Sequence, residues 1–90
     1  MIVISYDIKD TKLRTAFSKM LMKNGAIRLQ MSVYEVRNSQ RVLENVKIEI
    51  EHRYSQKFDG GDSIVVFETL ESKTVKYGNA IHRDSEILYF

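Results

Sequence analysis

The stretch that decides the fold runs from Ala26 to Arg37 and reads AIRLQMSVYEVR. Apolar and polar side chains alternate along most of it, which is the period of a β-strand with one covered face. The stretch is long for one strand, because strands usually have about 5–6 residues. We therefore predict a bend or tight turn near residues 30–32 and two short strands in place of one.

On the N-terminal side of this stretch, the sequence predicts a strand followed by a helix. Residues 2–6 are β-branched or aromatic apart from Ser5 and favour a strand. A helix over residues 11–23 follows, with Asp10 and Thr11 as candidate N-caps and Gly25 suited to the left-handed position after its end. Its apolar side chains recur at helical spacing and form one stripe: Leu13, Ala16, Phe17, Met20 and Leu21.

On the C-terminal side, the pattern predicts a second helix over residues 39–57, a turn over 59–62 and a strand over 63–68. Beyond that strand, residues 74–77 have the composition of a short strand, and the chain ends on the apolar run 87–90. An apolar end left in water would be an aggregation edge, so we expect it to pair with a sheet in this chain or in a partner.

The resulting order of elements predicts one α+β domain over residues 1–90. It is the ferredoxin-like βαββαβ pattern, an antiparallel sheet with two helices on one face. We expect the C-terminal strand to pair with a dimer partner, which makes residues 71–90 an interface-forming tail.

Composition excludes several classes of function. The chain has no Cys, which excludes disulfide scaffolds, Cys-based zinc sites and thiol nucleophiles. Its apolar runs are far shorter than the roughly 20 residues that span a membrane, and its start does not have the pattern of a signal peptide, so we expect a cytoplasmic protein. The formal net charge of +2 is unevenly distributed, because residues 8–30 carry six basic side chains against one acidic side chain.

The basic side chains of residues 8–30 are candidate contacts to nucleic acid. Lys12 lies in the first turn of the predicted helix and Lys9 just before it, where a positive charge opposes the helix dipole. One interpretation is a surface that binds backbone phosphates beside free helix N–H groups. The other is an ordinary solvated helix face. The set comprises Lys9, Lys12, Arg14, Lys19, Lys23 and Arg28.

Asp7, at the end of the first predicted strand, is the candidate for metal binding and catalysis. Its carboxylate could bind Mg²⁺, although one carboxylate makes a weak site unless a two-fold dimer brings two copies together. The alternative is that Asp7 or Asp10 caps the first helix. Neither His52 nor His82 belongs to an H-E-x-x-H motif, and no acid–base–nucleophile triad can be assembled.

In their order and spacing, three motifs resemble those of the CRISPR-associated protein 2 family. They are Tyr6-Asp7 at the end of the first strand, the QMSVYE stretch of residues 30–35, and Asp62-Ser63 at the opening of the strand 63–68. The resemblance covers residues 1–68 well and the tail loosely. Val36 stands where members often have Gly, which affects the strand boundary only.

The resemblance implies a ferredoxin-like fold and a two-fold homodimer whose C-terminal strands reach the partner sheet. It also implies a role in CRISPR adaptation, in which the dimer binds duplex DNA and bridges the CRISPR-associated integrase during spacer acquisition. A weak Mg²⁺-dependent endonuclease activity on RNA or DNA is implied as well, with Asp7 as metal ligand. Further implied residues are Tyr6, Ser32 and Tyr34 beside the site, and Ile87, Leu88, Tyr89 and Phe90 at the dimer interface.

Two other functions stay open on the same fold. One is a toxin-type ribonuclease, and the other is a ferredoxin-like regulatory module that binds a small molecule. The basic first helix has no evident purpose in a regulatory module, whereas a protein that binds phosphate would use it.

Overall fold

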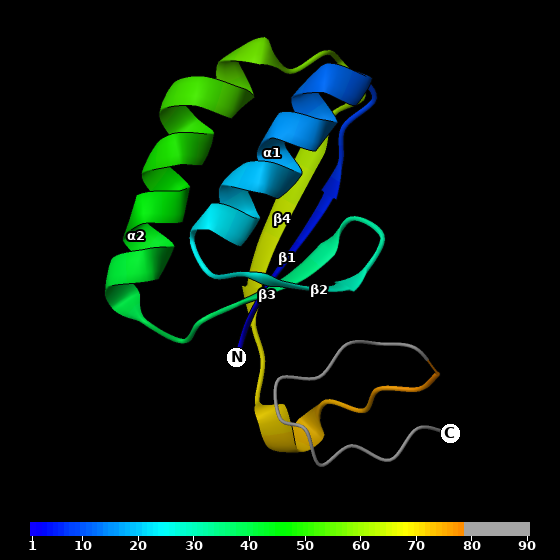
Figure 1. Ribbon diagram of the computed structural model, residues 1–90, viewed down its shortest axis with the longest axis vertical. Helices are drawn as coiled ribbons and strands as arrows, with labels where there is room; N and C mark the ends of the chain where they lie inside the picture. The colour runs from blue at the N-terminus through cyan, green and yellow to red at the C-terminus, as the bar shows by residue number, and fades with distance from the viewer. Residues whose placement is uncertain (79–90) are drawn as a thin grey trace.

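The computed structural model describes residues 1–78, in which four strands form one antiparallel sheet in the order β2-β3-β1-β4. Helices α1 and α2 lie side by side, and β1 and β4 run behind α1 (Figure 1). This arrangement confirms the predicted α+β fold of ferredoxin-like type. The elements are β1 (Ile2–Asp7), α1 (Thr11–Lys23), β2 (Ile27–Gln30), β3 (Val33–Val36), α2 (Gln40–Glu49) and β4 (Ser63–Glu68).

The stretch from residue 26 to residue 37 forms a tight hairpin, as predicted. Met31 and Ser32 make the turn between β2 and β3, and the pairing register shifts between Arg28 and Gln30. Ser32 has a φ of 65°, a left-handed conformation that is uncommon for a residue with a Cβ atom. The Tyr6 backbone N–H donates to the Ser32 carbonyl over 3.1 Å, which fixes the turn beside the end of β1.

The N-terminus of α1 shows which of the two candidate aspartates, Asp7 or Asp10, caps the helix. Asp10 is the N-cap, and its Oδ2 atom accepts a hydrogen bond from the Leu13 backbone N–H over 2.8 Å. At the other end Gly25 has a φ of 85°, the left-handed conformation predicted for it. Asp10 is therefore the aspartate that caps α1, and the alternative that Asp7 is the cap is wrong.

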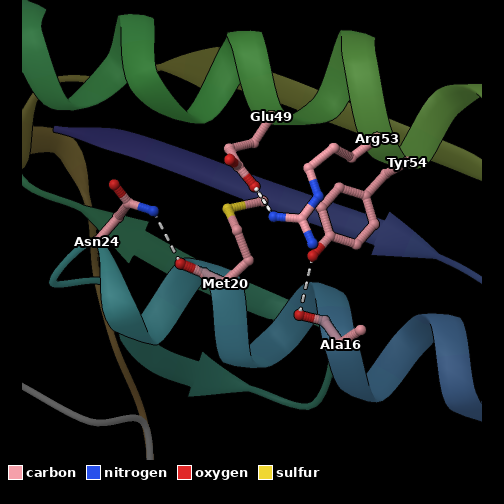
Figure 2. A network of polar contacts seen from close by, with 6 residues as sticks. All are labelled: Ala16, Met20, Asn24, Glu49, Arg53 and Tyr54. Carbon is pink, nitrogen blue, oxygen red and sulfur yellow. Dashed lines mark hydrogen bonds and ion pairs between the residues drawn. The ribbon is translucent and has the colours of Figure 1, made fainter.

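The second helical segment extends to Lys57 as predicted, but it is not an α-helix throughout. After α2 the chain makes a π-helical turn, Ile50–Tyr54, and a 3₁₀ turn, Ser55–Lys57. The wide turn places Tyr54 against α1, where its hydroxyl donates to the Ala16 carbonyl over 3.3 Å (Figure 2). Single π turns of this kind are frequent at functional sites.

The core lies between the helices and the face of the sheet that they cover. Ile4, Phe17 and Leu21 are completely buried. The Phe17 ring makes edge-to-face contacts with Tyr6 and Tyr54, at centroid distances of 4.8 and 5.2 Å. Since these three rings come from three different elements, the aromatic cluster holds β1, α1 and the second helical segment together.

The opposite face of the sheet, called the open face below, carries Val65 and Phe67 of β4, which stay 54% and 45% exposed. The chain leaves β4 beside the N-terminus, whose ammonium group donates to the Thr69 carbonyl over 2.9 Å. It returns to the open face through Lys76, whose Nζ atom lies 3.4 Å from Oε1 of the buried Glu35.

The short strand predicted over residues 74–77 is wrong. A 3₁₀ turn, Glu71–Lys73, precedes this segment, and the Thr74 backbone N–H and hydroxyl donate to the Glu71 and Leu70 carbonyls. These local hydrogen bonds favour a turn where the β-branched composition favoured a strand. The predicted interface strand of residues 87–90 lies outside the described residues.

Candidate nucleic-acid interface

Asp7 ends β1 on the open face of the sheet. It pairs with Ser63 of β4, and its side chain is exposed. Because side chains alternate along a strand, Asp7 points away from the face that Tyr6 shares with the helices. Within residues 1–78, no group of three or more acidic, His or Cys side chains could hold a metal ion. One chain therefore offers a single carboxylate and does not by itself fit a Mg²⁺ site.

Lys9 and Asp62 join the connection after β1 to the loop before β4. The Asp62 carboxylate accepts hydrogen bonds from the Asp59 and Lys9 backbone N–H groups, each over 2.9 Å. These bonds, and then the Lys9 charge, lower the pKa of Asp62 below its ordinary value. The end of the Lys9 side chain lies against Gly61, and a Cβ atom there would displace this flexible side chain. The aspartate of the Asp62-Ser63 motif thus has a structural role.

The six predicted cations do not form one surface. Lys12, Lys19 and Lys23, called the lysine stripe below, recur at helical spacing and share one side of α1. Two grooves border this side. The first, of about 530 Å³ at the start of α1, includes Lys9 and Lys12, and the second, of about 620 Å³ between α1 and α2, includes Lys19 and Lys23.

The grooves contain two further cations that the sequence reasoning missed. Lys57 lines the first groove and Arg53 lines the second. They lie four residues apart at the end of the second helical segment. This spacing is the only feature of the sequence that indicates that Arg53 and Lys57 lie on the same side of the segment. Ala16 lines both grooves, so the small side chain at the middle of α1 makes them adjacent.

Residues that line the groove between α1 and α2 form a network of polar contacts (Figure 2). Arg53 forms an ion pair with Glu49 over 3.0 Å, and the Asn24 side-chain amide donates to the Met20 carbonyl over 2.9 Å. Within the described part of the chain, Lys19 and Lys23 have no acidic side chain at ion-pair distance. Their charge is thus available to an anion from outside.

Arg14 and Arg28 lie apart from the lysine stripe, on the side of α1 that faces the hairpin. They line a pocket of about 380 Å³, called the hairpin pocket below, which does not include Asp7. Tyr6, Ser32 and Tyr34, the three residues predicted to lie beside the Asp7 site, line this pocket. Its complete lining is Tyr6, Arg14, Thr15, Ser18, Arg28, Met31, Ser32 and Tyr34.

Hydroxyl groups form one wall of the hairpin pocket. The Ser18 and Tyr34 hydroxyl oxygens are 2.6 Å apart, and the Tyr34 ring stacks on the Tyr6 ring at a centroid distance of 6.1 Å. Burial, and then the adjacent Tyr34, raise the pKa of Tyr6, while the Ser18 hydroxyl and the Arg28 charge act to lower it. Arg28 is therefore close enough to this hydroxyl cluster to act on it electrostatically.

No helix within residues 1–78 is long and apolar enough to cross a membrane.

Comparison with known proteins places the chain in a family. A search of curated proteins gives no significant match. The model of the family described as CRISPR associated protein Cas2 matches residues 1–76, the greater part of the chain. The chain therefore belongs to the CRISPR associated protein Cas2 family, and it is a CRISPR adaptation protein.

Proposed function

We propose that the chain acts in the cytoplasm as a homodimer that holds duplex DNA and bridges the CRISPR-associated integrase during spacer acquisition. The observation that carries this proposal is the opposite chemistry of two faces of one small domain. The open face of the sheet exposes the apolar side chains of Val65 and Phe67, whereas the side of α1 that borders α2 carries the lysine stripe. Exposed apolar side chains suit a second copy of the chain, and a basic surface suits phosphate.

The open face supports dimer formation. Val65 and Phe67 are exposed there, and β4 is the last strand of the sheet, so its outer edge has no strand partner within residues 1–78. Exposed apolar surface next to an open strand edge is a typical protein interface. A second copy would cover both, and residues 87–90 of each chain would extend the contact.

The lysine stripe supports DNA binding. Two-fold symmetry would double the stripe, and six lysines along two helices can each neutralise a phosphate. Lysine binds phosphate as a point charge and reads no base edge, so the duplex would be held without regard to sequence. A scaffold for spacers of any sequence needs this kind of contact.

Co-expression with the integrase encoded beside the same CRISPR repeats tests the bridging function. The expected result is a stable complex in which one dimer of this chain joins two integrase dimers, with a duplex retained at low salt. Mass photometry of the purified complex gives the stoichiometry. Purification of the two proteins as separate species, with or without a duplex, would contradict the bridging role.

A metal-dependent phosphodiesterase is the second candidate function, favoured by the exposed position of Asp7 outside the helix cap. If the open faces of two copies meet, Asp7 can approach Asp7 of the partner subunit, which supplies the second carboxylate that one chain lacks. This candidate thus depends on the dimer. No observation on residues 1–78 favours the toxin-type ribonuclease or the regulatory module.

Replacing Asp7 by Asn should reduce Mg²⁺-dependent cleavage of RNA or DNA at least about a hundredfold and leave the dimer intact, because the amide keeps the shape but not the charge. Cleavage of labelled oligonucleotides by the purified variants measures the effect. Asp10→Asn is the matched control, since Asn caps a helix as well as Asp does. Equal cleavage by Asp7→Asn and the wild type would assign the activity to another site or to a contaminant.

A further inference from the structure

The hairpin pocket has the lining of a site for an anion. Two guanidinium groups and five hydroxyl groups border it, and no carboxylate does. Met31, which is 79% exposed, is the one apolar side chain of the lining. Guanidinium groups can only donate hydrogen bonds, and hydroxyl groups can donate them as well. Two positive charges and no negative charge in the lining favour an anion over a cation.

The two arginines approach the pocket from different elements. Arg28 of β2 is directly opposite Tyr34 of β3, so the two side chains share the face of the sheet that the helices cover. Arg14 comes from α1, where its guanidinium donates weakly to the Ile8 carbonyl over 3.3 Å and to the Thr11 hydroxyl over 3.5 Å. A guanidinium has five N–H donors, so most donors of Arg14 stay available to a ligand.

The hydroxyl wall is rigid and can turn its hydrogens to a ligand. Tyr34 is 3% exposed and is fixed by its stacking on Tyr6 and by the 2.6 Å contact with Ser18. Hydroxyl hydrogens rotate, and a phosphate oxygen is a stronger acceptor than a neutral hydroxyl oxygen. The wall is thus organised before a ligand arrives.

We propose that the hairpin pocket binds one phosphate group, which Arg14 and Arg28 hold against the Ser18 and Tyr34 hydroxyls. The Tyr6, Ser32 and Tyr34 side chains would then serve phosphate recognition on the covered face, and not the Asp7 carboxylate on the open face. Arginine forks fix the direction of a phosphate, whereas the lysines of the stripe attract phosphates without fixing them. The phosphate belongs to a nucleic acid if the proposed function holds, and the site itself does not depend on that function.

Titration of the full chain with inorganic phosphate at constant ionic strength tests the site. The backbone amide signals of Ser18 and Ser32 should shift, and Arg28→Gln should weaken binding about tenfold or more. Arg28 is exposed on a strand, so its replacement leaves the fold intact. Arg41→Gln on α2 removes the same charge away from the hairpin pocket and from the lysine stripe, and it should change the affinity less than about twofold. Tyr34→Phe keeps the ring stack and should weaken binding severalfold.

Oligonucleotide duplexes identify where the phosphate comes from. If Arg28→Gln weakens binding only of 5′-phosphorylated duplexes, the pocket takes a strand end, and if it weakens 5′-hydroxyl duplexes equally, the pocket takes a backbone phosphate. Both results support the site. Equal effects of Arg28→Gln and Arg41→Gln on inorganic phosphate would overturn it. Phosphate binding that depends on Arg28, in a chain that binds no duplex, would keep the site and contradict the proposed DNA-binding function.

Discussion

Phe67→Asp is expected to convert the protein from a dimer to a monomer. Phe67 is 45% exposed on the open face, next to Val65 and opposite Val3 of β1. A carboxylate at this position would be buried in the dimer without a partner, and two-fold symmetry would bury it twice. We expect the dissociation constant of the dimer to rise at least about a hundredfold, which corresponds to about 2.7 kcal/mol.

Sedimentation velocity over a range of concentrations measures this effect, and Ile48→Asp is the matched control. Ile48 is 53% exposed, similar to Phe67, but it lies on α2 beside the groove between the helices. Because neither side chain is in the core of a single chain, both variants should remain folded, which circular dichroism checks. A Phe67→Asp protein that remains a dimer would show that the copies meet elsewhere, and the shared Asp7 site would lose its basis as well.

Local patterns predicted most of the fold. The alternation in residues 26–37 was too long for one strand, and this length alone indicated the hairpin. The π-helical turn Ile50–Tyr54 could not be predicted in this way. Leu43, Val46, Ile50 and Tyr54 recur at ordinary helical spacing, whereas the wider turn comes with contacts of Tyr54 to Phe17 and the Ala16 carbonyl on another helix.

The candidate site was predicted less well, because the basic side chains were grouped by their position in the sequence and not by the side of the helix on which they lie. Lys12 and Arg14 are two positions apart on α1, a spacing that places them on opposite sides of a helix. Helical geometry could therefore have separated the lysine stripe from the hairpin pocket. The meeting of Ser18 with Tyr34 could not have been predicted, because it depends on how α1 packs on the hairpin.

Replacing all three lysines of the stripe by Ala should reduce the affinity for duplex DNA about a hundredfold or more at low salt. The dimer would lose up to about six phosphate contacts, and each contact contributes about 0.9 to the slope of log K against log salt concentration. The slope should thus become shallower by about 5. Fluorescence anisotropy with duplexes of unrelated sequence, over a series of salt concentrations, measures both quantities, and the losses should be equal for all sequences.

The matched control removes three cations outside the two grooves: Arg37, Arg41 and Lys47. It lowers the net charge by the same amount, so it accounts for any general electrostatic attraction between the protein and DNA. If the stripe forms the interface, the control should keep most of the affinity and most of the slope, because a non-contacting charge releases no counterion. Equal losses in the two variants would mean that DNA responds to the total charge of the dimer, and the lysine stripe would then not be a binding surface.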